Sequence, residues 1–289
     1  MIDLHTHSTA SDGTLSPEEL ADLAAEKGLR AIALTDHDTV GGVAAALERG
    51  NHRRVLVIPG VELGARYNGG GQMHILGYYI DHRHPFLLDR LSWLRARRRE
   101  RAEKIVSRLH EIGVPISRDR VFQFAGIGSL GRPHVARALL EAGHVRSVSE
   151  AFDRYLKEGA PAFIEKFQFT SRQAIRLIRT SGGVAVLAHP ASLKLSPNGL
   201  EACVEQLISE GLGGIEVYWS KHSKSEIAYY EGVATRFGLI VTAGSDFHGI
   251  NKPTIELGAQ LHGQADEAHV LDALETAKRL AGTRTMQSN

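Results

Sequence analysis

Short apolar runs alternate with segments of helical periodicity at the start of the chain and again from about residue 165 onward. Each run has the length of a buried strand, and polar or turn-forming residues follow it directly. The predicted strands lie at residues 1–8, 29–34, 55–58, 73–78, 184–188, 214–219 and 239–243. Helix signals fill the gaps, such as Ser16 and Pro17 at one helix start. This repeated order predicts a parallel α/β sheet, either closed into a barrel or doubly wound.

The pattern changes between about residues 85 and 160, where no strand signal is found. Apolar residues such as Leu88, Leu91 and Leu109 recur there at helical spacing. Further helices are predicted at residues 118–124, 133–141 and 149–157. We therefore predict an all-helical insertion over residues 85–164, within a barrel domain formed by residues 1–84 and 165–289.

Composition limits the possible partners and the compartment. The 289 residues are 43% hydrophobic, and the net charge is +1 with histidine neutral, so no overall field selects a polyanion such as DNA. The basic run Arg95–Lys104 is either a solvated helix face or a guide for nucleotide or RNA phosphates. The single cysteine, Cys203, fits a reducing compartment. With neither a signal-peptide pattern nor a long apolar run, we expect a cytoplasmic protein that does not bind membranes.

Metal-ligating residue types occur at or near the carboxyl ends of the predicted strands. Alternation along a strand places His5 and His7 on one side, where they either begin a metal site or lie on a polar face by chance. The recurrence of such residues favours a site. The candidates are His5, His7, Asp12, His37, Glu62, His74, His189, Asp246 and His248. They converge only if the strands close around one mouth, because a flat sheet would spread them over roughly 25 Å.

The ligand types indicate which metals the site would take. Six imidazoles and three carboxylates exceed the needs of one ion, since catalytic zinc takes three protein ligands and water. They suit two or three divalent ions that share a bridging carboxylate, for which Glu62 is the candidate. Mixed nitrogen and oxygen ligation suits manganese, iron or zinc and argues against calcium or a thiolate cluster.

The predicted insertion contains a glycine-rich stretch, Gly126–Gly131, followed by Arg132, Pro133 and His134. Its GxGxxG spacing is not a dinucleotide fingerprint, because the preceding segment is predicted to be a helix. The glycines give a flexible backbone that leads into a helix start, with proline at the first helical position. Such a helix start is a natural anion site. The guanidinium of an arginine adds a planar pair of donors. The alternative is a helix-capping loop with a solvated arginine. Ser129, Arg132 and His134 are the candidate substrate-binding residues.

The ordered motifs resemble those of the PHP (polymerase and histidinol phosphatase) family. They are His5-x-His7, Thr35-Asp36-His37-Asp38, Pro59-Gly60-Val61-Glu62, His74-Ile75-Leu76-Gly77, Ala188-His189-Pro190 and Gly244-Ser245-Asp246-x-His248. The resemblance implies a distorted (β/α)7 barrel and a trinuclear metal site. We expect manganese there, with iron and zinc as the alternatives. It assigns the ligands to three ions in the sets His5, His7, Glu62 and Asp246; Asp12, His37 and His248; and Glu62, His74 and His189.

The resemblance also implies the chemistry. A metal-bridging hydroxide, held by Glu62, Asp246 and His248, would attack phosphorus, while the metals stabilise charge on the phosphoryl oxygens. The family branch with a helical insertion acts on nucleotides and holds a substrate phosphate with a similar Gly-Arg-Pro-His. The expected function is therefore hydrolysis of the 3'-phosphate of nucleoside 3',5'-bisphosphates. The sequence assigns neither the proton donor for the leaving group nor the oligomeric state.

Several alternatives stay open. A 5'-3' exoribonuclease acting on short RNA would use the same site. A histidinol-phosphate phosphatase is disfavoured because that branch does not usually carry this insertion. An amidohydrolase acting on C–N bonds also opens with His-x-His, but a mid-barrel lysine or fewer histidines would be expected. A nucleic-acid-binding module is disfavoured by the near-zero net charge and by the full set of candidate ligands.

Overall fold

A computed structural model of the protein describes residues 1–67, 72–125, 130–258 and 267–286. The chain divides into two compact units. The first unit combines Met1–Asp89 with Gln168–Asn289, and the second consists of Arg90–Phe167. Among the described residues, no helix combines the length and the apolar character that crossing a bilayer requires.

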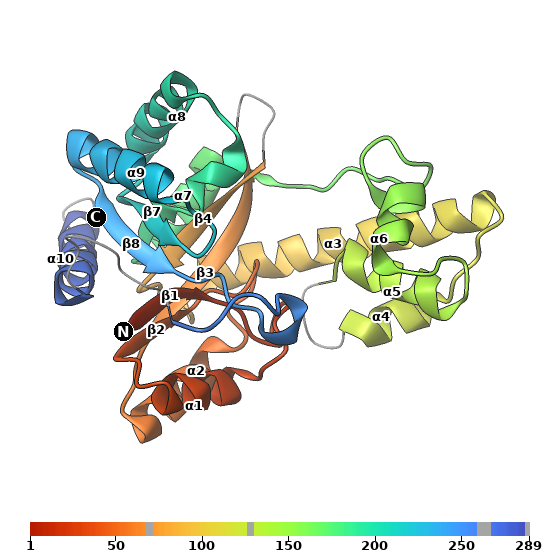
Figure 1. The fold of residues 1–289 in the computed structure, drawn as a ribbon, viewed down its shortest axis with the longest axis horizontal. Helices are drawn as coiled ribbons and strands as arrows, with labels where there is room; N and C mark the ends of the chain where they lie inside the picture. The colour runs from red at the N-terminus through yellow and green to blue at the C-terminus, as the bar shows by residue number, and fades with distance from the viewer. Residues whose placement is uncertain (68–71, 126–129, 259–266, 287–289) are drawn as a thin grey trace. The chain divides into compact units, whose positions relative to one another are not determined.

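The first unit is built around one sheet with the strand order β1-β2-β3-β4-β6-β7-β8. Its strands are β1 (Ile2–Thr6), β2 (Ala31–Leu34), β3 (Leu56–Arg66), β4 (Gln72–Tyr78), β6 (Val184–Leu187), β7 (Gly214–Trp219) and β8 (Ile240–Gly244). The short strand β5 (Phe169–Thr170) pairs with β3 off this path. The first strand also meets the last, because the amide of His7 donates to the carbonyl of Phe247 at 3.0 Å. The sheet is therefore a nearly closed barrel (Figure 1).

Strand β4 departs from the predicted parallel sheet. It runs antiparallel to both neighbours, β3 and β6, whereas the other pairs along the path are parallel. Strand β3 extends to Arg66, well beyond the predicted strand at residues 55–58. The gap between β3 and β4 is too short for a crossover helix, so the chain must reverse. The glycine triplet at residues 69–71, whose composition predicts a hairpin turn, lies outside the described residues.

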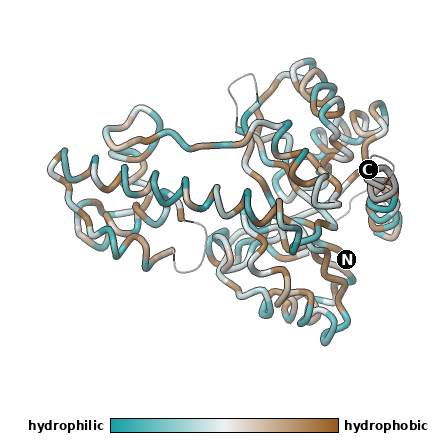
Figure 2. The backbone as a smooth tube through the Cα atoms, turned by 180° about the vertical axis from the view of Figure 1, so that it is seen from behind, coloured by the Kyte–Doolittle hydropathy of each residue, from teal (hydrophilic) through white to brown (hydrophobic). Residues whose placement is uncertain are grey.

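Helices follow the strands of the first unit. They are α1 (Pro17–Glu26), α2 (Val43–Arg53), α7 (Ser171–Thr180), α8 (Pro197–Glu210), α9 (Lys224–Phe237) and α10 (Glu267–Met286), with the short 3-10 helices η2 (Pro190–Leu193) and η3 (Gly249–Asn251). The predicted cap of α1 is present, because Ser16 accepts from the amide of Glu19 in a capping box. Hydrophobic residues are concentrated in the strands (Figure 2), and β1, β2 and β6 are buried along their whole length. This core fixes the positions of the strand ends.

The second unit is helical in its described part. It contains most of the long helix α3 (Pro85–Glu111), followed by α4 (Arg118–Ala125), α5 (Arg132–Glu141), α6 (Val148–Ala151) and a π-helix, η1 (Phe152–Leu156). Its buried residues form a cluster of their own, which includes Leu109, Val121 and Leu139. The second unit therefore has a hydrophobic core of its own, as a compact domain requires.

Candidate metal centre

The barrel brings all nine predicted ligands together. They come from the ends of β1, β2, β6 and β8, from the loop after β1, and from within β3 and β4. Their ligand atoms form four overlapping groups, in each of which all atoms lie within 4.8 Å of one another. The groups are His7, Asp12, His37 and His248; His5, Glu62 and His189; His5, His7 and Asp246; and His37, Glu62 and His74. The overlap is the arrangement that several ions with shared ligands require.

Glu62 lies at the centre of the cluster, with its side chain fully buried. Each of its two oxygens faces more than one imidazole. Oε1 lies 2.8 Å from His74 Nδ1 and 3.1 Å from His189 Nε2, and Oε2 lies 2.9 Å from His37 Nδ1, 3.3 Å from His7 Nε2 and 3.4 Å from His5 Nε2. A carboxylate with ligand nitrogens around both oxygens has the geometry of a bridging ligand.

The other two carboxylates lie at the edges of the cluster. Oδ1 of Asp246 is 3.5 Å from His7 Nε2 and 3.6 Å from His5 Nε2. Oδ1 of Asp12 is 3.3 Å from His248 Nε2. The side chain of Asp12 is 46% exposed, whereas that of Asp246 is 7% exposed. The cluster therefore opens toward solvent on the side of Asp12, which leaves a route for a substrate.

His74 reaches the cluster by a different route from the one predicted. It is the third residue of β4 and so lies near the beginning of the strand, not at its carboxyl end. Because β4 runs antiparallel, its amino end lies beside the carboxyl ends of the neighbouring strands. The expectation that His74 marks a carboxyl strand end is wrong, although its place in the cluster agrees with the sequence prediction.

The outer nitrogens of two imidazoles are fixed by acceptors. Nδ1 of His5 lies 2.9 Å from Glu216 Oε1, and Nδ1 of His248 lies 2.8 Å from the carbonyl oxygen of Asp246. A carbonyl oxygen can only accept, as does an ionised carboxylate, so Nδ1 donates in both pairs. The lone pair of a neutral ring is then on Nε2, which points into the cluster. This is the tautomer that a metal ligand needs.

Several buried polar atoms of the cluster have no hydrogen-bond partner. Among the described residues these include Nε2 of His5, both ring nitrogens of His7, and Oε2 of Glu62. Buried polar atoms are nearly always satisfied in native structures. Divalent cations coordinated by these atoms would satisfy them, and the nitrogen and oxygen donor set suits manganese, iron or zinc. The residues present therefore fit a cluster of divalent metals.

Electrostatics keep the carboxylates of the cluster charged. Burial on its own would raise the pKa of Glu62, but the imidazoles of His37, His74 and His5 hold that pKa well below its usual range. Burial also lowers the pKa of His37 to about 4. Burial on its own would lower the pKa of His7, but the nearby carboxylates of Asp246 and Glu62 outweigh it and raise the pKa to about 9. Protons therefore compete with metal at His7.

Backbone strain is found at two of the candidate ligands. Asp246 has φ 63° and His189 has φ 25°, which lie in the left-handed region that glycine favours. Such conformations persist where the surrounding structure holds them in place, and they are frequent at functional sites. Each residue lies two positions after the end of its strand, β6 for His189 and β8 for Asp246, and the strained turn directs its side chain into the cluster.

Sequence reasoning missed the buried acids that support the ligands. Glu216 binds His5, and its Oε2 also accepts from the backbone amide of His189 at 2.7 Å. Asp36 accepts from Ser8 and Ser11, in the loop that leads to Asp12. A carboxylate inside an apolar strand, as in the run Gly214–Trp219, was the available signal. Such an acid must be paired when it is buried.

Two more acidic or basic groups near the cluster were also missed. Asp3 accepts from the amide and the hydroxyl of Ser245 and from the amide of Gly258, and burial raises its pKa to about 6. These bonds hold the segment that carries Asp246. Nζ of Lys252 lies 2.7 Å from Asp246 Oδ2, which places a cation at the edge of the cluster.

The candidate substrate residues lie in the second unit. Nη1 of Arg132 donates to the carbonyl of Leu156 at 2.9 Å. The ring of His134 accepts from the amide of Gly131 at 3.1 Å, so it caps the helix that it belongs to. Ser129 lies outside the described residues.

Comparison with known proteins gives consistent matches over most of the chain. The PHP domain matches residues 3–165. The 5'-3' exoribonuclease Rnm of Escherichia coli is 36% identical over 263 residues, which cover 90% of this chain and 89% of the relative. The 3',5'-nucleoside bisphosphate phosphatase of Chromobacterium violaceum is 34% identical over 248 residues, or 86% of this chain and 87% of the relative. A solved structure described as a metal-dependent phosphoesterase, from Bifidobacterium adolescentis, superimposes with a TM-score of 0.80 at 30% identity, covering 94% of this chain and 95% of that one.

Proposed function

The chain belongs to the PHP domain family of metal-dependent phosphoesterases, and we propose that its substrate is a phosphorylated nucleotide. The observation that supports this best is the buried carboxylate of Glu62 with imidazole nitrogens around both of its oxygens. We assign His5, His7, Asp12, His37, Glu62, His74, His189, Asp246 and His248 as the metal ligands. The assignment of these ligands to three separate ions, as the family resemblance implies it, is also part of the proposal. His7 and His37 each belong to two geometric groups, so the distances alone do not assign them to one ion.

The residues of the cluster have distinct tasks in this proposal. Divalent cations bound there supply a nucleophilic water at neutral pH and stabilise negative charge on phosphoryl oxygens. Glu62, Asp246 and Asp12 offset the positive charge of the ions and fix their spacing. Glu216 and the carbonyl of Asp246 hold two imidazoles in the ligand tautomer. We propose manganese as the resident metal and the cytoplasm as the location.

The substrate proposal is the 3'-phosphate of a nucleoside 3',5'-bisphosphate. It is supported by the similarity to the Chromobacterium violaceum phosphatase. We propose that residues 85–164 act as an all-helical inserted domain in which Ser129, Arg132 and His134 bind a substrate phosphate. The second candidate is the 5' end of a short RNA, which the similarity to the Escherichia coli exoribonuclease favours.

A panel of substrates separates these possibilities. Phosphate or nucleotide release would be measured with added manganese from adenosine 3',5'-bisphosphate, AMP, histidinol phosphate and a 5'-phosphorylated oligoribonucleotide. We expect turnover of the bisphosphate, and a loss of about 10-fold or more in kcat/KM for Arg132→Ala, because a hydrogen bond to a charged group contributes about 1.5–3 kcal/mol. Turnover of histidinol phosphate only, or of no phosphoester, would contradict the assignment. In the second case C–N substrates would be tested next.

A further inference from the structure

A lysine from outside the set of candidate ligands reaches the metal centre. Nζ of Lys252 lies 2.7 Å from Oδ2 of Asp246, and the two side chains are 32% and 7% exposed. The other oxygen of Asp246, Oδ1, faces the imidazoles of His5 and His7 at 3.6 and 3.5 Å. Asp246 therefore has one oxygen that faces the ligand nitrogens and one that accepts from Lys252.

The segment that carries Lys252 is fastened to the open side of the cluster. The side chain of Asn251 donates to the backbone carbonyl of Asp12 at 2.8 Å, and the amide of Ile250 donates to Oγ1 of Thr14 at 3.1 Å. Both acceptors belong to the loop after β1, which carries the half-exposed ligand Asp12. Lys252 therefore lies on the side where the cluster opens to solvent, which is the side that a substrate approaches.

A glycine allows this attachment to be close. Gly249 has φ 63°, and a Cβ atom there would lie 2.1 Å from Oγ1 of Thr14. A side chain at this position would push the segment away from the loop, in a backbone conformation that glycine favours. The amide of Lys252 also donates to the carbonyl of Gly249 at 3.1 Å. The backbone thus fixes where the Lys252 side chain begins.

The chemistry of the Lys252 ammonium group suits an anion. The group has three N–H donors, of which the bond to Asp246 uses one, so donors remain for a second acceptor. Its charge repels divalent cations, so Lys252 does not favour metal binding at the neighbouring ligands. The same charge attracts an anion that binds beside the ions, and lysine serves as a point charge for phosphate. A phosphoryl group is the ligand that fits both the ions and the lysine.

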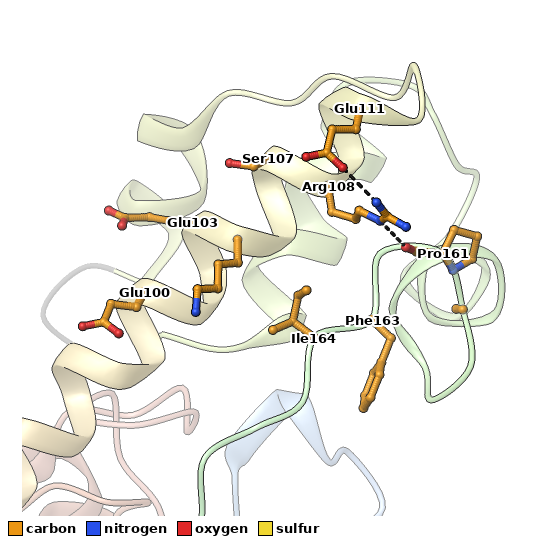
Figure 3. A pocket seen from close by; sticks show the side chains of 10 residues that line it. Glu100, Glu103, Ser107, Arg108, Glu111, Pro161, Phe163 and Ile164 are labelled. Atoms are coloured by element: carbon orange, nitrogen blue, oxygen red, sulfur yellow. Dashed lines mark hydrogen bonds and ion pairs between the residues drawn. The ribbon is translucent and has the colours of Figure 1, made fainter.

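A large cavity in the second unit has a lining of mixed charge. It measures about 910 Å³ and lies along α3, beside the segment that contains Pro161 (Figure 3). Its charged lining consists of Glu100, Glu103 and Glu111 against Lys104 and Arg108. Arg108 is occupied by Glu111 and by the carbonyl of Pro161. This mixed and partly paired lining does not select a phosphate.

We propose that Lys252 is a catalytic residue that donates a hydrogen bond to a non-bridging oxygen of the phosphoryl group to be cleaved. Water supplies the hydroxyl group that joins phosphorus and the proton that the leaving alcohol takes up, while the ester P–O bond breaks. Lys252 transfers no proton and offsets negative charge on the phosphoryl oxygens. The proposal rests on the proposed function, because it requires a phosphoester substrate at the assigned metal ligands.

Binding of inorganic phosphate to the full-length enzyme tests this contact without turnover. Lys252→Met removes the charge and keeps a long side chain, whereas Lys252→Gln keeps an N–H donor for Asp246. Manganese binding would be titrated first, and we expect neither variant to bind it more weakly than the wild type. At saturating manganese, calorimetry should show phosphate binding about 10-fold weaker in both variants. Lys27→Met is the matched control, because Lys27 is 35% exposed and pairs with Glu256, outside the ligand set.

The binding data decide between a phosphate contact and a structural role. Weaker manganese binding in both variants, with normal phosphate affinity at saturating manganese, would show that Lys252 only positions Asp246 and would overturn the proposal. Unchanged phosphate binding in both variants would overturn it as well. Circular dichroism would check that each variant folds, and the second substitution keeps the test valid if one does not.

Kinetics separate the role of Lys252 from the choice of substrate. The variants would be compared on adenosine 3',5'-bisphosphate and on p-nitrophenyl phosphate, which share only the phosphoryl group. We expect kcat/KM to fall about 10-fold or more on both, with Lys27→Met unchanged. A fall on the bisphosphate alone would overturn the phosphoryl contact. Turnover of p-nitrophenyl phosphate only would refute the nucleotide assignment and leave Lys252 in its role. If no phosphoester is hydrolysed, the proposed function fails, and phosphate binding decides about Lys252.

Discussion

At the scale of single residues, the metal centre depends on Glu216, which does not itself belong to the candidate ligands. Its two oxygens hold the ring of His5 and the backbone of His189, and its side chain is fully buried. We predict that Glu216→Gln weakens metal binding by about 10–100-fold, as losses of outer hydrogen-bond partners typically do. An amide is uncharged and has only one acceptor oxygen for the two donors. Metal content after dialysis against a graded chelator would measure the loss.

The control for this prediction is Glu205→Gln, at an exposed position on α8. It should keep the wild-type metal content. If Glu216→Gln retains metal as well as the control does, then His5 is positioned by packing alone and the role assigned to Glu216 is wrong. A far-ultraviolet spectrum of both variants would separate loss of metal from loss of fold.

Residue chemistry also explains what could be predicted from the sequence. The ligands were found because histidines and carboxylates recur at or near the ends of the apolar runs, a recurrence that favours a shared metal site. Glu216 was missed because it lies within such a run, where strand periodicity does not distinguish a supporting acid from any other strand residue. Its partner His5 is separated from it by 211 positions. A contact between residues so far apart in the sequence forms only when the barrel closes. The local pattern of apolar and polar residues does not encode that closure.

At the scale of elements, the approach of β8 to β1 leaves no room for a side chain at Gly244. A Cβ atom there would lie 2.2 Å from Cβ of His5 and 2.8 Å from Oε1 of Glu216. We predict that Gly244→Ala destabilises the fold by about 1–3 kcal/mol, because overpacking forces neighbouring groups to shift. It should also lower the metal content, since His5 is displaced. Thermal denaturation and metal analysis would measure the two effects.

Gly232→Ala is the matched control for this substitution. Gly232 lies within α9, and a Cβ atom there would meet nothing within 4 Å. Alanine is favoured over glycine in a helix interior by about 0.5–1 kcal/mol, so this variant should be as stable as the wild type or slightly more stable. Equal stability and equal metal content in Gly244→Ala and Gly232→Ala would show that β8 can move away from β1.

The elements also show where pattern-based prediction fails. The existence of the strands was predictable because apolar runs bounded by turn residues are a strong signal. The direction of β4 was not, because the side-chain period of a strand is the same for either direction. Only the short connection after β3 distinguishes a hairpin from a crossover. The reversal matters for function, since it brings His74 to the same edge as the other ligands.

At the scale of the whole molecule, the proposed metal ligands and the proposed phosphate-binding residues belong to different compact units. All nine proposed ligands lie within Met1–Asp89 and Gln168–Asn289, whereas Ser129, Arg132 and His134 lie within Arg90–Phe167. Each unit buries its own hydrophobic cluster. Metal binding should therefore stabilise the first unit and leave the second unaffected.

Calorimetric unfolding of the full chain with and without a chelator tests this separation. At a metal concentration of 100 times Kd, binding stabilises the native state by about 2.7 kcal/mol. For a unit of this size each kcal/mol shifts Tm by about 2–4 °C, so chelation should lower one transition by roughly 5–11 °C. Leu109→Ala, in the core of the second unit, identifies the other transition, because a cavity there costs about 2–5 kcal/mol. A single transition that responds to both changes would mean that the units unfold together, and would contradict the prediction.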